Sequence, residues 1–132
     1  MIGTLSLALA LGGALQDDEV NCVDPQYQVE MNRCARLDFE AADAELNRVW
    51  ARAIAAAREG DRHLDREFDT RPTEEATLRE AQRAWIVFRD SHCTVEGYRE
   101  ARGGSMETMV YEGCRAQLTR DRIAQLEPPA DE

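Results

Sequence analysis

The sequence predicts an all-α domain, a small antiparallel three-helix bundle in up-down-up order that is stapled by two disulfides. Three long segments carry apolar residues at helical spacing, and glycine- and proline-containing stretches separate them. No run alternates apolar and polar residues in the way that a strand would. The 132 residues suffice for one modest core, and connections of about ten residues favour antiparallel neighbours.

The first expected helix begins between Pro25 and Met31 and runs to about Arg58, before Gly60. Its apolar positions step alternately by four and three residues, which keeps one stripe on one face. Asp24 before Pro25 is a typical helix entry, because an N-cap acceptor precedes a residue without an N–H. The stripe consists of Met31, Ala35, Phe39, Ala42, Leu46, Val49, Ala53 and Ala56.

A polar stretch, residues 60–72, predicts a loop with one helical turn around Leu64 and Phe68. Thr73 is the expected N-cap of a second helix that runs to about Glu96. Its expected core stripe is Leu78, Ala81, Trp85 and Phe88, flanked by Ala84 and Val87.

The third expected helix follows a loop between Gly97 and Ser105, in which Ser105 is the N-cap. Pro128 stops this helix, so we assign 21–127 to the helical domain and 128–132 to a disordered tail. The apolar face of the third helix is broader and less regular; it holds Met109, Val110, Cys114, Leu118, Ile123 and Leu126.

An uncharged apolar run opens the chain and is too short for a membrane span, which needs about twenty residues. We interpret residues 1–14 as a signal peptide, because cleavage after Ala14 would place small residues at positions −3 and −1. Residues 15–20 are then a linker. The expected product is periplasmic or secreted, with no stable membrane insertion after cleavage; the alternative is an uncleaved amino-terminal anchor.

Four cysteines, Cys22, Cys34, Cys93 and Cys114, predict two disulfides in a small exported domain. Three pairings are open to four cysteines. The expected helix arrangement favours the local pairs, Cys93 with Cys114 and Cys22 with Cys34. A continuous helix from Pro25 to Cys34 would rise about 13 Å, whereas bridged Cα atoms lie about 5.5 Å apart. The chain from Cys22 must therefore fold back, or the helix must start later.

The formal net charge is −10, and all sixteen basic residues are arginine. Such a surface repels nucleic-acid phosphates and anionic lipid headgroups, so neither is an expected partner. It speeds encounter with a cationic protein, although solubility alone explains the charge equally well.

Polar residues inside the helical segments suggest one structural network. Asp43 and Asn47 lie one helical turn apart, and Asp90 follows Arg89. We expect these residues to join the first and second helices through Arg83 or Arg89, because buried charges need partners. The alternative is a catalytic or ligand-holding cluster.

Catalytic and metal chemistry find little support in the sequence. His92 and Cys93, with Cys114 and Asp90, would be the best metal ligands, but zinc sites show tighter pairs and an oxidised sulfur neither binds metal nor attacks a substrate. The Gly103-Gly104 pair lacks the preceding strand and the lysine of a phosphate-binding loop. We expect no cofactor, no metal and no enzymatic activity.

Five segments resemble the LprI-like family, a family of small secreted or periplasmic bacterial domains of which one branch gave the label lysozyme inhibitor. The segments are EMNRCA (30–35), AADAELNRVW (41–50), QRAWIVFRDSHC (82–93), GGSM (103–106) and CRAQLTRDR (114–122), so that the resemblance covers about residues 21–127. It implies a helical fold and a C-x11-C pair near the amino terminus, which agrees with local disulfide pairing.

The resemblance also implies a binding protein that inhibits lysozyme, which we expect to act by occluding the enzyme's cleft. The candidate contact surface is the glycine-rich connection between the second and third helices: Tyr98, Arg99, Arg102, Gly103, Gly104 and Ser105. Arginines there can reach the two carboxylates of a lysozyme cleft. The alternative is a cell-envelope structural or interaction protein without activity toward lysozyme. The sequence leaves the oligomeric state open.

Overall fold

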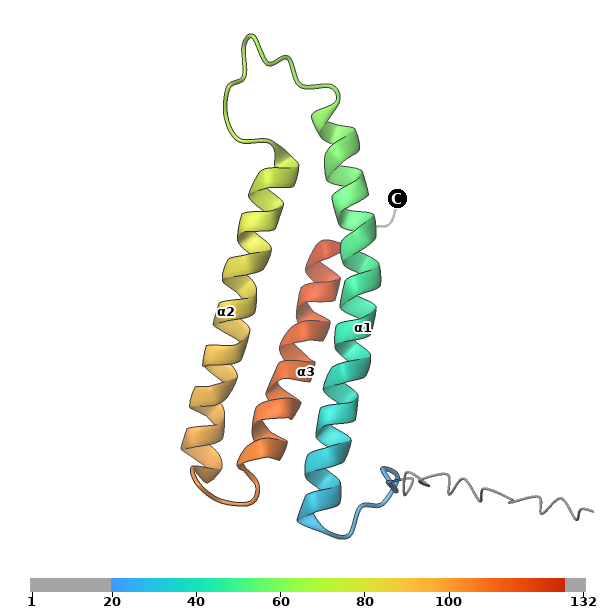
Figure 1. Ribbon diagram of the computed structural model, residues 1–132, viewed down its shortest axis with the longest axis vertical. Helices are drawn as coiled ribbons and strands as arrows, with labels where there is room; N and C mark the ends of the chain where they lie inside the picture. Colours follow the sequence, from blue (N-terminus) through green and yellow to red (C-terminus); the bar gives the residue numbers. More distant parts are fainter. Residues whose placement is uncertain (1–19, 128–132) are drawn as a thin grey trace, which may run out of the picture.

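The computed structural model describes residues 20–127, which form three helices. These are α1 (Gln28–Asp61), α2 (Glu74–Ala101) and α3 (Glu107–Leu126), and no strand occurs in this part of the chain. Figure 1 shows α1 and α3 running in the same direction and α2 running against both. The predicted all-α class with two disulfides is confirmed. The expected signal peptide, linker residues 15–19 and the tail from 128 onward lie outside the described residues.

The start of α1 explains how the first disulfide forms. Gln28 lies inside the predicted interval, but Asp24 and Pro25 are not the helix entry. The Glu30 carboxylate instead accepts the N–H groups of Gln26, at 2.9 Å, and of Tyr27, at 3.3 Å. Because the helix starts late, the preceding segment can double back. The Cα atoms of Cys22 and Cys34 lie 5.6 Å apart, and the predicted local pairing is confirmed.

The connection between α2 and α3 is much shorter than predicted. Thr73 is the N-cap of α2, as expected, and its hydroxyl accepts the Ala76 N–H at 3.2 Å. The helix then continues past Glu96, so that the turn comprises residues 102–106 alone, and the N-cap of α3 is Met106 instead of Ser105. Gly97, which we expected to open the loop, is a buried helical residue packed against α3.

The apolar stripe of α1 forms one wall of the core. Phe39, Ala42, Leu46 and Val49 are buried as predicted. Beyond Val49 the prediction is wrong by one position, since Ala57 is buried while Ala56 is exposed. A helix has 3.6 residues per turn, so a strict four-three pattern drifts off the buried face. The core cluster of Leu46, Val49 and Leu126 is completed by the partly buried Trp50, Ala53, Leu78, Trp85 and Ile123.

The buried face of α2 differs more from the prediction. Gln82, Arg89, Cys93 and Gly97 are its buried residues, whereas Phe88 is 54% exposed. Two of the four residues expected in the core stripe, Ala81 and Phe88, are therefore exposed instead. Two polar side chains occupy the positions that apolar ones were expected to fill.

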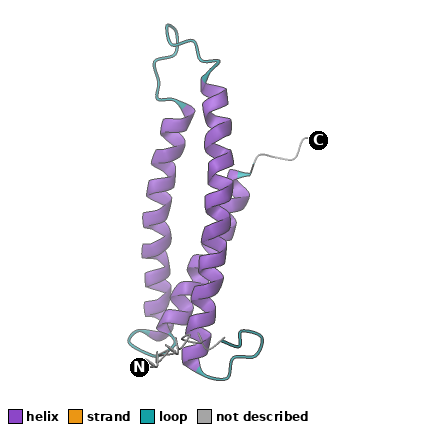
Figure 2. Ribbon diagram, turned by 45° about the vertical axis from the view of Figure 1, so that its right-hand side comes forward, coloured by secondary structure: helices purple, strands orange, loops and turns teal. Residues whose placement is uncertain are grey.

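The ends of the bundle differ in construction. α1 and α2 extend beyond the end of α3 and are joined there by residues 62–73, while the short α2–α3 turn lies at the opposite end (Figure 2). The predicted helical turn in the longer loop is present, with the Phe68 and Asp69 N–H groups donating to the Asp65 carbonyl. Within the described residues, no helix has the length and apolar character of a membrane span.

Candidate functional site

A buried arginine joins all three helices at the centre of the bundle. The Arg89 side chain is 6% exposed; its Nε donates to Asp90 Oδ1 at 2.9 Å, and its terminal nitrogen lies 3.5 Å from Asp43 Oδ1. The same nitrogen donates to the Thr119 hydroxyl at 3.4 Å. The structure thus brings three of the five predicted network residues together: Asp43, Arg89 and Asp90.

The other two predicted members lie elsewhere. Asn47 and Arg83 are exposed, and neither takes part in the hydrogen bonds of Arg89. Arg89, and not Arg83, provides the link between α1 and α2 at this level of the bundle.

A second arginine extends the polar interior toward the α2–α3 turn. Arg115 Nε donates to Asp90 Oδ1 at 3.1 Å, and its terminal nitrogen donates to the buried Glu112 carboxylate at 3.1 Å. Its guanidinium also lies 3.7 Å from the ring centre of Phe39 and 5.0 Å from that of Tyr111. Cation–π contacts of this kind keep a charged group stable next to apolar rings.

Several interior polar residues were missed by the sequence reasoning. Arg122 donates to the buried Gln82 side chain at 2.9 Å, and burial lowers the pKa of Arg122. Thr119 and Glu112 are buried on α3. One signal was present on α2: Gln82, Trp85, Arg89 and Cys93 recur at steps of three and four. That spacing puts them on one face, although two of the four are polar.

No catalytic constellation emerges from these groups in the part of the chain that the structure describes. Every buried side-chain nitrogen and oxygen there has a hydrogen-bond partner. His92, Glu96 and Cys114 have potential ligand atoms within 4.8 Å of one another, but the Cys114 sulfur is bonded to Cys93. A disulfide sulfur is not a thiolate ligand, so this group does not fit a metal ion.

The α2–α3 turn has a backbone held by short hydrogen bonds. Gly103 adopts a φ of 74°, the left-handed region that favours glycine, and its N–H donates to the Glu107 carboxylate at 2.5 Å. Gly104 N–H donates to the Ala101 carbonyl at 2.7 Å. The Arg102 guanidinium lies 4.1 Å from the ring centre of Tyr98. The turn therefore has a specified conformation and displays an arginine stacked on an aromatic ring.

Two further contacts tie this turn to the bundle. The predicted Cys93–Cys114 disulfide is confirmed, and it joins α2 to α3 about two helical turns away from the α2–α3 turn. The Asn32 side chain on α1 donates to the Ser105 carbonyl at 2.9 Å. Both covalent and hydrogen-bonded links thus restrain the turn relative to all three helices.

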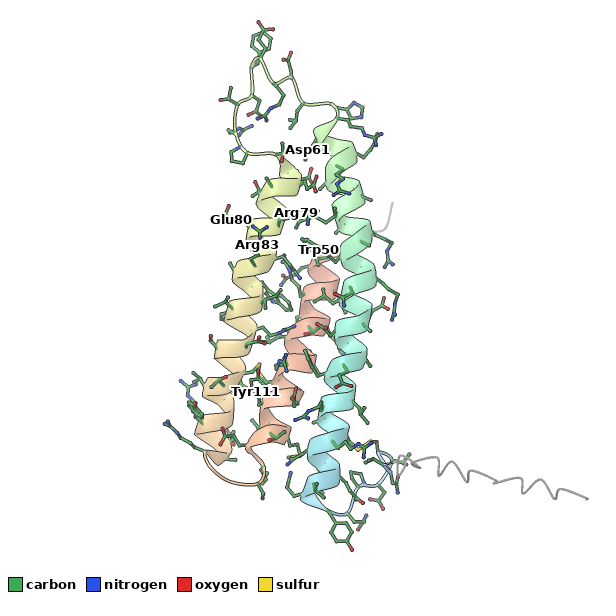
Figure 3. The ribbon with its side chains drawn as sticks, in the orientation of Figure 1. Trp50, Asp61, Arg79, Glu80, Arg83 and Tyr111 are labelled. Carbon is green, nitrogen blue, oxygen red and sulfur yellow. A yellow bond between two sulfur atoms is a disulfide. The ribbon has the colours of Figure 1, made fainter. Side chains whose placement is uncertain are left out.

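A shallow hollow lies beside the turn. It measures about 510 Å³, and its lining includes three of the six predicted contact residues, Tyr98, Gly103 and Gly104. Glu107 and Tyr111 line it as well, and Figure 3 shows Tyr111 toward the turn end of the bundle. Arg99 and Ser105 are exposed nearby, on the last turns of α2 and in the turn itself. All six predicted contact residues thus lie at one end of the molecule.

Two comparisons with known proteins give matches to this chain. The family model described as lysozyme inhibitor LprI matches residues 21–126. An uncharacterized protein of Rhizobium meliloti (strain 1021) is 43% identical over 111 residues, which cover 84% of this chain and 79% of that protein. No solved structure matches the chain significantly. The family match spans nearly every described residue, and the chain belongs to the lysozyme inhibitor LprI family.

Proposed function

We propose that this protein is an exported binding protein that inhibits a lysozyme, and that the α2–α3 turn makes the contact. Family membership supports inhibition as the activity. The observation that carries the choice of surface is the Arg102 guanidinium stacked on Tyr98 in a turn whose glycines, disulfide and hydrogen bonds restrain its shape.

Restraint matters because binding loses less entropy when the contact surface is already ordered. Cys93–Cys114, the Gly103–Glu107 hydrogen bond and the Asn32–Ser105 hydrogen bond each remove freedom from the turn before any partner arrives. A free loop of the same sequence would have to be ordered at about 0.5–1.5 kcal/mol per immobilised side chain.

Electrostatics favours the same partner. Glycoside hydrolases of the lysozyme type work with two carboxyl groups in a cleft. Arg99 and Arg102 project from the turn end of the molecule and can pair with such carboxylates in the bidentate geometry that guanidinium groups favour. The net charge of −10 would at the same time speed the approach of a cationic enzyme.

Two disulfides support an exported location, since they persist in oxidising compartments. A signal peptide over residues 1–14, with cleavage after Ala14, would bring the chain there. None of the described cysteines is free, so no cysteine thiolate is available as a nucleophile among them.

The test is lysis of bacterial cell walls by several lysozyme types, with and without the oxidised chain at micromolar concentration. We expect slower lysis by at least one type, with a stronger effect at low ionic strength. Arg102→Ala should weaken inhibition about tenfold, which corresponds to about 1.4 kcal/mol for a charge-assisted contact.

Arg62→Ala is the matched control. Arg62 is exposed at the opposite end of the bundle, where it pairs with Glu59, so its loss changes net charge equally without touching the turn. Unchanged lysis with every lysozyme type would refute the proposal and favour an envelope interaction protein. Equal losses in the two variants would refute the choice of surface.

A further inference from the structure

One side of α2 is apolar and exposed in the described structure, where Phe88 stacks on His92 of the same helix with ring centres 5.2 Å apart. We define the outer α2 face as Ala81, Ala84, Val87, Phe88, Ser91, Val95 and Tyr98, all of which are exposed. Val87 is 67% exposed and Phe88 54%. Steps of three and four put these residues on one side of the helix, opposite Gln82, Arg89 and Cys93.

The composition of this face is unusual for the chain. The protein carries 26 acidic and 16 basic residues, yet none of these seven positions is charged. A surface helix of a monomeric protein normally turns its charged residues outward and its apolar residues to the core. On α2 the buried face contains Arg89 and Gln82 beside the core residues Trp85 and Cys93, whereas Val87, Phe88, Val95 and Tyr98 are exposed to solvent. Such an arrangement marks a contact surface.

We propose that the outer α2 face binds the same face of a second copy, with the two α2 helices antiparallel about a two-fold axis near Ser91. Residues at equal distances from Ser91 then meet across the axis. Ala84 lies opposite Tyr98 of the other copy, and Val87 lies opposite Val95. The large Tyr98 thus faces a small side chain, two medium ones face each other, and the small Ser91 at the axis permits close approach of the helices.

The charges at the ends of the face support this register. Glu80 and Arg102 are equidistant from Ser91, so the antiparallel pair brings each Glu80 to the Arg102 of the other copy, forming two ion pairs. Glu80 is exposed on the outer side of α2 (Figure 3) and has no ion pair among the described residues. A parallel pair would place Glu80 against Glu80, which is repulsive.

The remaining arginines do not oppose this arrangement. Helical spacing of 100° per residue puts Arg83 at one edge of the face and Arg99 at the other. In the antiparallel pair, the edge that carries Arg83 lies against the Arg83 edge of the second copy, and the Arg99 edge lies against the Arg99 edge. Arg83 of one copy therefore does not meet Arg99 of the other. An anionic membrane surface is a poorer occupant, because a net charge of −10 is repelled by it.

The expected affinity is modest. From Glu80 to Arg102 the face is about 33 Å long and one helix wide. A contact of this size lies at the low end of specific protein interfaces, so we expect a dimer with a dissociation constant on the order of micromolar. Tyr98 and Arg102 also belong to the proposed lysozyme contact. If that proposal holds, a second copy and the enzyme compete for them.

Sedimentation equilibrium of the oxidised chain, without lysozyme, tests self-association independently of the proposed function. Between about 1 and 500 μM we expect a concentration-dependent monomer–dimer equilibrium. Phe88→Glu should leave a monomer throughout. Phe68→Glu is the matched control, since Phe68 is 84% exposed in the distant loop, and it should dimerise like the parent. Far-UV circular dichroism checks that both variants are folded.

A charge exchange tests the register. Glu80→Arg and Arg102→Glu should each weaken the dimer about tenfold, and the double variant should restore it to within about threefold. A parent chain that stays monomeric at 500 μM, a Phe88→Glu variant that still dimerises, or equal loss in the Phe68→Glu control would each overturn the proposal. Failure of the double exchange to restore affinity would overturn the antiparallel arrangement.

Discussion

We predict that removing the buried Arg89 destabilises the bundle less than removing the charges of its two carboxylate partners. A simple count of broken contacts would predict the opposite. Arg89 has a side chain 6% exposed, but the carboxylates that neutralise it, on Asp43 and Asp90, are 41% and 40% exposed. Removing the arginine therefore leaves two carboxylates that water can solvate. Removing the carboxylate charges leaves a cation that water barely reaches.

The magnitudes follow from this asymmetry. Leaving an uncompensated charge buried costs about 3–5 kcal/mol. We expect about 3 kcal/mol for the double variant Asp43→Asn/Asp90→Asn, because the amide oxygens still accept hydrogen bonds. Arg89→Met should cost about 1 kcal/mol, since it loses hydrogen bonds while its flexible thioether still packs against Phe39 and Trp85.

Urea unfolding at pH 7 with both disulfides intact measures these free energies. Adding Arg89→Met to the double variant should restore about 2 kcal/mol, because the triple variant has no buried charge at this position. Asp38→Asn is the control, as its ion pair with Arg120 is half-exposed and should contribute under 1 kcal/mol. The reasoning is wrong if Arg89→Met costs more than the double variant, or if the triple variant is the least stable.

Two further predictions concern the ends of the bundle. The Arg71 guanidinium lowers the pKa of Asp69 to about 2 from its ordinary 3.8, so this carboxylate contributes stability above pH 3.8 that is lost as the pH falls toward 2. Carboxyl NMR titration of Arg71→Ala should return that pKa toward 3.8, and an unchanged value would contradict the pairing. A Cβ at Gly97 would lie 3.4 Å from Glu107 Cγ, an ordinary contact distance. Gly97→Ala should therefore raise the free energy of unfolding by about 0.5–1 kcal/mol through helix propensity, whereas Gly97→Leu should lower it, both in urea unfolding.

The sequence was sufficient for the class, the number of helices and the disulfide pairing. Three long periodic segments with breaks between them leave few arrangements, and Thr73 is a cap that acts locally, through its own hydroxyl and the Ala76 N–H. Features that depend on residues close in sequence are readable in this way. Cys22 and Cys34 pair because α1 starts at Gln28, a boundary that the predicted interval already contained.

Which face of α2 is buried could not be read in the same way. Hydrophobicity ranks Phe88 as core and Arg89 as surface. The structure inverts them because Arg89 finds two carboxylates and a hydroxyl on its side, on α1, α2 and α3. Such compensation depends on residues far apart in the sequence. Gly97 was misassigned for a similar reason, since its role is close packing against α3 instead of breaking α2.

Part of one family-like segment faces the interior of the bundle, so a binding activity must reside on other surfaces. In the segment QRAWIVFRDSHC, five residues make contacts inside the bundle. Gln82 accepts from Arg122, the Trp85 ring lies under the Arg89 guanidinium, and Arg89 donates to Thr119. Asp90 accepts from Arg115, and Cys93 is bonded to Cys114. Because these residues are occupied in stabilising the fold, a binding partner must contact other side chains. The turn offers Arg99 and Arg102, and the outer α2 face offers Phe88 and Val95. Neither surface is required for the interior network, so both can change between relatives while the bundle stays the same.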